Sequence, residues 1–144
     1  MPKYVVAFLA LLLSGQAAWA FGPSNVTLDE LQPHYRVLLI FPGNRDPRPI
    51  VHSLEQARSA MRAREVVWFI LGSSLIANGP YSFNNRYRDE LFQRYGSPHD
   101  GAGLVLIGRN GAIKLRERGS VNLKQVYQIL DGMGTSTLPA EADR

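Results

Sequence analysis

Residues 104–116, which read LVLIGRNGAIKLR, predict an antiparallel β-hairpin. Four apolar residues form its first strand, and Asn110-Gly111 supplies the positive φ angles that a tight turn requires. In the second strand apolar and charged residues alternate from Ile113 to Arg116. We therefore expect its two apolar side chains on one face and its two charged ones on the other. Charges at these positions are typical of an edge strand, because they oppose pairing with a second sheet.

Two uninterrupted apolar segments precede the hairpin, at residues 37–41 and 66–71. Segments of this kind are typical of parallel strands that are buried on both faces. The apolar residues between them recur at helical spacing, at Ile50, Leu54, Ala57 and Met61. The spacing predicts one helix that begins near Pro49, so the segment as a whole is a right-handed β-α-β unit.

The rest of the chain completes an α/β pattern. We expect residues 75–85 to be irregular, because they contain Gly79-Pro80, and a second helix to follow from about Arg86 to Tyr95, with Asn85 as its cap. A last helix is predicted from Asn122 onward. The resulting order, β-α-β-α-β-β-α, predicts a four-stranded mixed sheet flanked by helices.

This order is that of the thioredoxin fold, and particular segments are similar to one family. They are residues 28–31, 36–41, 46–48 and, most specifically, 103–111 with 114–116. In these segments the chain resembles the thioredoxin-like domain of unknown function numbered 4174, over roughly residues 28–133. The resemblance implies a thioredoxin-like fold in a family that is exported in bacteria and recurs as modules in extracellular-matrix proteins. It implies no particular activity.

Cysteine is absent from the chain. Disulfides, thiolate zinc sites and iron–sulfur clusters are therefore excluded. A thiol–disulfide oxidoreductase is excluded as well, because exchange requires a thiolate. Aligned with a redox thioredoxin, the CxxC position falls near residues 46–49, and the cis-proline position falls near Gly103.

Residues 1–20 predict a cleaved signal peptide. Lys3 precedes the apolar run 5–13, and Ala18-Trp19-Ala20 fits the small-x-small pattern before a cleavage point. An uncleaved anchor helix is the alternative. After cleavage we expect no membrane span, a leader at residues 21–27, a thioredoxin-like domain at 28–134 and a flexible tail at 135–144. The protein would then be periplasmic or secreted.

The formal net charge is +4, from 16 basic and 12 acidic residues. Basic and acidic residues alternate along the chain, which is typical of a mixed, solvated surface. Together with export, this pattern argues against nucleic acid as a partner. An envelope protein or an anionic ligand is the expected partner.

The loop of residues 44–48 is the best candidate binding surface. Arg45, Asp46 and Arg48 follow a predicted parallel strand and precede a helix, which is where ligands bind in open α/β sheets. Two guanidinium groups near a helix N-terminus would suit a carboxylate, a phosphate or a sulfated glycan. Alternatively, Asp46 only caps the turn and both arginines are solvated. On the edge strand, Lys114 and Arg116 either dock a partner or only deter pairing.

No catalytic residue, metal site or cofactor is predicted. His34, His52 and His99 lie on three separate segments, and Ser73-Ser74 lacks the GxSxG pattern of a nucleophile elbow. We interpret the chain as an exported, non-redox binding or accessory module of the cell envelope. One alternative is a cysteine-independent enzyme, oxidoreductase-like or a hydrolase, with its site at the Arg45-Asp46-Arg48 loop. Another is a purely structural module. An enzyme would place perturbed acids in a pocket at this loop, whereas a binding module would present a flatter patch.

Overall fold

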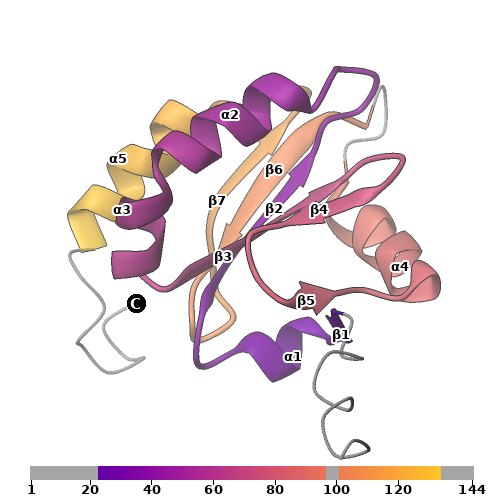
Figure 1. The fold of residues 1–144 in the computed structure, drawn as a ribbon, viewed down its shortest axis with the longest axis horizontal. Coiled ribbons are helices and arrows are strands. Elements are labelled where there is room, and N and C mark those ends of the chain that lie inside the picture. The colour runs from indigo at the N-terminus through magenta and orange to yellow at the C-terminus, as the bar shows by residue number, and fades with distance from the viewer. Residues whose placement is uncertain (1–22, 97–100, 134–144) are drawn as a thin grey trace, which may run out of the picture.

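A five-stranded mixed sheet forms the centre of the protein in the computed structural model, which describes residues 23–96 and 101–133 (Figure 1). Its strands follow the order β4-β3-β2-β6-β7. They are β4 (Leu75–Ala77), β3 (Val66–Leu71), β2 (Arg36–Phe41), β6 (Gly103–Ile107) and β7 (Ile113–Arg118). Strands β2 and β3 are parallel, and the other neighbours are antiparallel. The prediction of an α/β fold with a mixed sheet flanked by helices is confirmed.

The prediction of four strands is wrong. Residues 75–77 were expected to be irregular, but they form β4, which pairs with the last three residues of β3. A second difference lies nearby, where β5 (Tyr81–Ser82) pairs in parallel with β1 (Ser24–Asn25). The leader is therefore fixed to the domain at this point. Strands of two or three residues are too short to show an alternating hydrophobic pattern in the sequence, and only their backbone hydrogen bonds to a partner strand identify them.

The hairpin forms as predicted, but its second strand does not alternate as expected. Gly111 has a φ of 83°, and Gly108 N–H donates to the carbonyl of Ala112 at 2.8 Å. Ile113 pairs with Ile107, whereas Leu115 pairs with the adjacent Leu106, so β7 carries a bulge at the residue between them. Directly opposed residues share a face of the sheet, so the bulge sends Ile113 and Leu115 to opposite faces.

Helices cover both faces of the sheet (Figure 1). One face is covered by α2 (Arg48–Gln56), α3 (Arg58–Ala63) and α5 (Leu123–Met133); the other is covered by α1 (Leu28–Leu31) and α4 (Asn85–Tyr95). The single helix expected from Pro49 is broken at Ala57, but Leu54 and Met61 still face the same core. The cap of α4 is Asn84, one residue before the expected one, and its side chain accepts from Tyr87 N–H at 2.8 Å.

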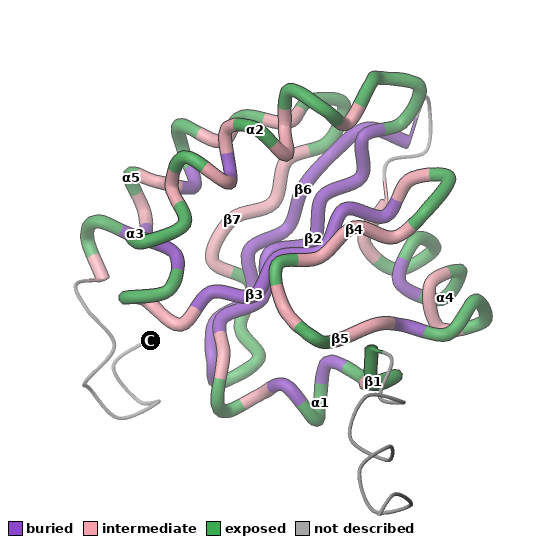
Figure 2. The backbone as a smooth tube through the Cα atoms, in the orientation of Figure 1, coloured by how far each residue is buried: buried purple, intermediate pink, exposed green. Residues whose placement is uncertain are grey.

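Alternate residues of the central strands pack into two separate cores, one on each side of the sheet. Val37, Leu39 and Phe41 of β2 face the core under α1 and α4. Leu38 and Ile40 of the same strand face the core under α2, α3 and α5. In Figure 2 strands β2, β3 and β6 are buried along their length, whereas β7 is mostly intermediate. The prediction of strands buried on both faces is confirmed.

Within residues 23–96 and 101–133, no helix is both long and apolar enough to span a bilayer. The predicted signal peptide at residues 1–20 and the predicted tail at 135–144 lie outside the described residues.

Candidate functional site

The loops that follow β2 and β3 lie side by side, because the two strands are parallel and end at the same edge of the sheet. They enclose a cleft of about 250 Å³. A Cβ atom placed on Gly72 would lie 3.2 Å from Cγ of Pro42, which shows how closely the two loops approach. The cleft is lined by Pro42, Gly43, Asn44, Arg45, Pro47, Ile70, Gly72, Ser73, Ser74 and Ile76. Part of the predicted loop therefore forms one wall of a cleft, and the loop after β3 forms the other.

Asp46 and Arg48 flank Pro47, which lines this cleft, and their side chains form an ion pair. The backbone N–H of Arg48 donates to Oδ1 of Asp46 at 3.0 Å, and Nε donates to Oδ2 at 2.9 Å. The same guanidinium lies 2.8 Å from Oδ2 through Nη2, and its side chain is 88% exposed. These hydrogen bonds from Arg48 lower the pKa of Asp46, and the carboxylate in turn raises the pKa of Arg48.

This pairing decides what Asp46 can do chemically. A carboxylate with a lowered pKa stays ionised at neutral pH and is a poor proton donor or acceptor. Asp46 also stabilises the turn before α2, as the structural alternative in the sequence analysis expected. The exposed guanidinium of Arg48 keeps N–H groups that point to solvent.

Arg45 is directed away from this pair. Its guanidinium donates to the carbonyl of Gly119, in the connection between β7 and α5, at 3.5 Å. Its backbone N–H donates to Pro42 at 3.1 Å, and Gly43 between them takes a φ of 61°, so the loop is a tight turn. Arg45 therefore links the candidate loop to the end of β7.

The other two predicted residues lie elsewhere on the molecule. Lys114 is at the bulge near the start of β7, close to the hairpin turn and at the far end of the strand from Gly119. Arg116 reaches α4, where Nη2 donates to the carbonyl of Arg94 at 3.0 Å. Among the five predicted site residues, the structure thus pairs the side chains of Asp46 and Arg48. Arg45 lies in the same loop but turns its side chain to Gly119, and Lys114 and Arg116 lie elsewhere.

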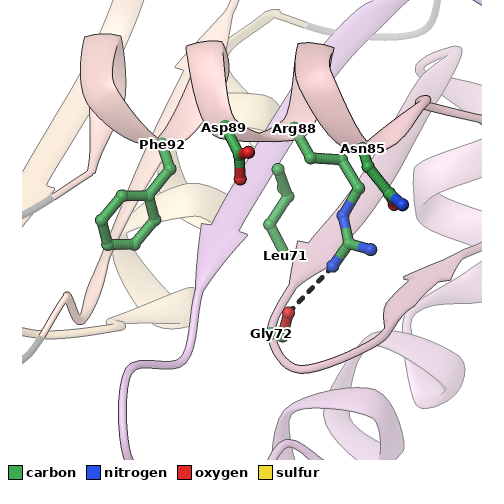
Figure 3. A pocket seen from close by; sticks show the side chains of 6 residues that line it. All are labelled: Leu71, Gly72, Asn85, Arg88, Asp89 and Phe92. Carbon is green, nitrogen blue, oxygen red and sulfur yellow. Dashed lines mark hydrogen bonds between the residues drawn. The ribbon is translucent and has the colours of Figure 1, made fainter.

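A second, smaller hollow of about 220 Å³ lies at the same sheet edge, between the end of β3 and α4. Figure 3 shows Arg88 reaching from α4 to the carbonyl of Gly72, to which Nη2 donates at 2.9 Å. Phe92 also lines it and remains 45% exposed. In the sequence, Ser73 and Ser74 were considered only as a nucleophile elbow, for which the GxSxG pattern is missing. The parallel pairing of β2 and β3 was the signal that would have placed them beside residues 42–48.

Buried charges that the sequence did not predict lie at the other end of the strands, where β2 begins and β6 ends. Arg36 is 2% exposed and donates to the carbonyl of Arg64 at 2.6 Å. Arg109 is 6% exposed and lies 3.5 Å from the carboxylate of Glu65. These residues lie at strand ends, where a buried cation has no periodic sequence pattern. A groove of about 750 Å³ runs nearby past Trp68 and Tyr81.

Metal-binding geometry is absent from the part of the chain that the structure describes: no three His, Asp or Glu side chains there are placed to hold an ion. His52 is exposed on α2, and His99 lies outside the described residues.

Comparison with protein families matches residues 27–137 to the family described as Domain of unknown function (DUF4174). The chain belongs to the DUF4174 family. This confirms the resemblance that the segments 103–111 and 114–116 carried. No curated protein and no solved structure matches the DUF4174 chain.

Proposed function

We propose that this DUF4174 chain is an exported, non-redox thioredoxin-like binding module of the cell envelope. Its binding surface is the cleft between residues 42–48 and 72–74, and its ligand is an anionic group on a small molecule or on an envelope protein. The signal-peptide pattern of residues 1–20 supports export.

The order of strands supports the thioredoxin-like part of the proposal. Without β4, the sheet order is β3-β2-β6-β7, with only β2 and β3 parallel. Helices α2 and α3 connect these two strands, and α5 follows the hairpin. This is the arrangement expected from β-α-β-α-β-β-α. In the alignment with a redox thioredoxin, the CxxC position falls near residues 46–49, which contain no thiol.

The main observation that supports a binding role is the Asp46–Arg48 ion pair next to a small cleft. No carboxylate lines that cleft among the described residues. Asp46, next to Pro47 of the cleft, is held ionised by Arg48. An acid–base enzyme needs a carboxyl group whose pKa is brought toward the working pH, and Asp46 is shifted the other way. Arg45 lines the cleft, and the exposed guanidinium of Arg48 is suited to binding an anion beside it.

Retention on an anionic matrix tests this proposal. On phosphocellulose, we expect Arg48→Ala to elute at clearly lower salt than the native chain, because it loses an exposed guanidinium next to the cleft. Arg62→Ala is the matched control, since Arg62 is also exposed but lies on α3. Equal shifts for the two variants would show that only net charge matters and would reject the cleft as the site.

Titration with inorganic phosphate distinguishes a shaped site from a charged surface. We expect backbone amide signals of residues 43–48 and 72–74 to shift together and to saturate, because both loops line the cleft. Shifts that grow linearly with phosphate or spread over all exposed arginines would contradict the proposal.

A further inference from the structure

The outer edge of β7 is open for pairing. Within residues 23–96 and 101–133, β7 pairs only with β6, whereas each inner strand has two partners. In an edge strand every second residue turns its N–H and C=O away from the sheet. At the opposite edge, β4 is only three residues long. The longer edge of the sheet is therefore that of β7, with six residues.

Cations dominate this edge. Lys114, Arg116 and Arg118 lie on β7 with a single acid, Glu117. The carboxylate of Glu117 accepts from the backbone N–H of Asn122 at 2.9 Å, so it is turned toward the start of α5. The charge that β7 presents to an incoming strand is consequently positive.

Arg116 is held in place beside this edge. Its Cζ lies 5.9 Å from the ring centroid of Tyr95, and Arg94 lies 5.8 Å from the same ring. Its Nη2 donates to the carbonyl of Arg94. A guanidinium fixed by a ring and a carbonyl loses little conformational entropy when it binds a carboxylate.

We propose that the outer edge of β7 binds an extended acidic polypeptide segment as an additional strand. Backbone hydrogen bonds from β7 would supply affinity, and the cations would select acidic side chains on the segment. The same cations disfavour a second copy of this chain, because β7 paired with β7 would bring like charges together. This surface is separate from the cleft at residues 42–48 and 72–74.

The test uses the full chain and a capped peptide of about eight alternating Glu and Val residues, a typical strand length. We expect saturable binding, and we expect amides of β7 to gain protection from hydrogen exchange. Lys114→Glu and Arg118→Glu should each weaken binding about tenfold, because each replaces an attractive contact with a repulsive one. Arg62→Glu is the control, with the same change of charge on the exposed face of α3.

Arg116→Glu is a third variant, and circular dichroism tests whether it still folds, because Arg116 packs on Tyr95. If Arg116→Glu does not fold, Lys114→Glu and Arg118→Glu still test the proposal. A peptide N-methylated at alternate residues should bind at least about tenfold more weakly, since it cannot form strand hydrogen bonds.

Three results would overturn the proposal. The first is equal binding of the methylated peptide, and the second is an equal loss in Arg62→Glu. The third is self-association of the native chain that Lys114→Glu abolishes, because it would make a second copy the occupant. Unchanged phosphate binding at residues 43–48 in the β7 variants would show that the two surfaces act independently.

Discussion

Asp46 interacts with Arg48 through both the side chain and the backbone of the arginine. The pair is exposed, so solvent weakens the attraction between its charges. Its main effect is therefore local, because it fixes the turn that enters α2 and sets the direction of the Arg48 guanidinium. The proposed binding role and the local structure therefore depend on the same two side chains.

Asp46→Asn removes the ion pair but keeps the hydrogen bond of the turn, because Oδ1 of asparagine can still accept from Arg48 N–H. Hydrogen bonds from Arg48 lower the pKa of Asp46 below its ordinary value of 3.8, so folding favours the ionised form. This contribution is fully present above the unfolded-state pKa and is lost as the pH falls through the lower folded value. We expect the variant to melt slightly below the native chain at pH 7, with the gap closing in acid. A gap that widens below pH 3.8 would contradict the lowered pKa.

At the scale of single residues, the position of the candidate loop could be predicted from the sequence, but the contacts of its side chains could not. Asp46, Pro47 and Pro49 are turn and helix-start residues wherever they occur, so the loop could be located from the sequence. The partner of Arg45, Gly119, is distant in sequence. Contacts of this kind depend on how the strands pair, and no local pattern records them.

At the level of elements, β3 is only partly covered by β4, and the side chain of Asn78 substitutes for the missing strand. Its Oδ1 accepts from Trp68 N–H at 2.9 Å, and its Nδ2 donates to the carbonyl of Val66 at 3.1 Å. Its own N–H donates to the carbonyl of Trp68 at 3.3 Å. One residue thus occupies three hydrogen-bonding positions along an otherwise open edge.

Asn78→Ala should lower the free energy of unfolding by about 1–2 kcal/mol, because it leaves Trp68 N–H and Val66 C=O without their side-chain partner. Chemical denaturation measures the loss. Amide exchange should accelerate at Trp68 and remain unchanged at Leu38. Asn84→Ala is an informative comparison, since it removes a cap of similar strength at the start of α4 instead of a bond to β3. Unchanged exchange at Trp68 would show that the amide contributes little.

The long elements were predictable and the short ones were not. Strands β2, β3 and β6 are almost continuous apolar segments, because both of their faces are buried. Such segments can be recognised in the sequence without knowing which strands pair. Strand β4 and the bulge at Lys114 depend on pairing with a neighbour. Because of the bulge, Arg116 lies on the same face of the sheet as Ile113 and contacts α4. Strict alternation in the sequence had predicted that these two residues lie on opposite faces.

For the whole molecule, export is the property that the proposed function requires first. The chain expressed with residues 1–20 should be recovered outside the cytoplasm with Phe21 as its first residue, because Ala18-Trp19-Ala20 precedes that position. N-terminal sequencing of the recovered protein measures this. Ala18→Arg with Ala20→Arg should block processing, whereas Ser14→Ala should not. A mature protein that retains Met1 would reject the predicted cleavage.

The two cores share one sheet, and β2 contributes alternate side chains to both. Loss of either helical layer would expose one side of every central strand and weaken the backbone bonds that the other layer depends on. The layers therefore cannot melt one after the other, and heat should convert the native protein to the denatured ensemble in a single cooperative step.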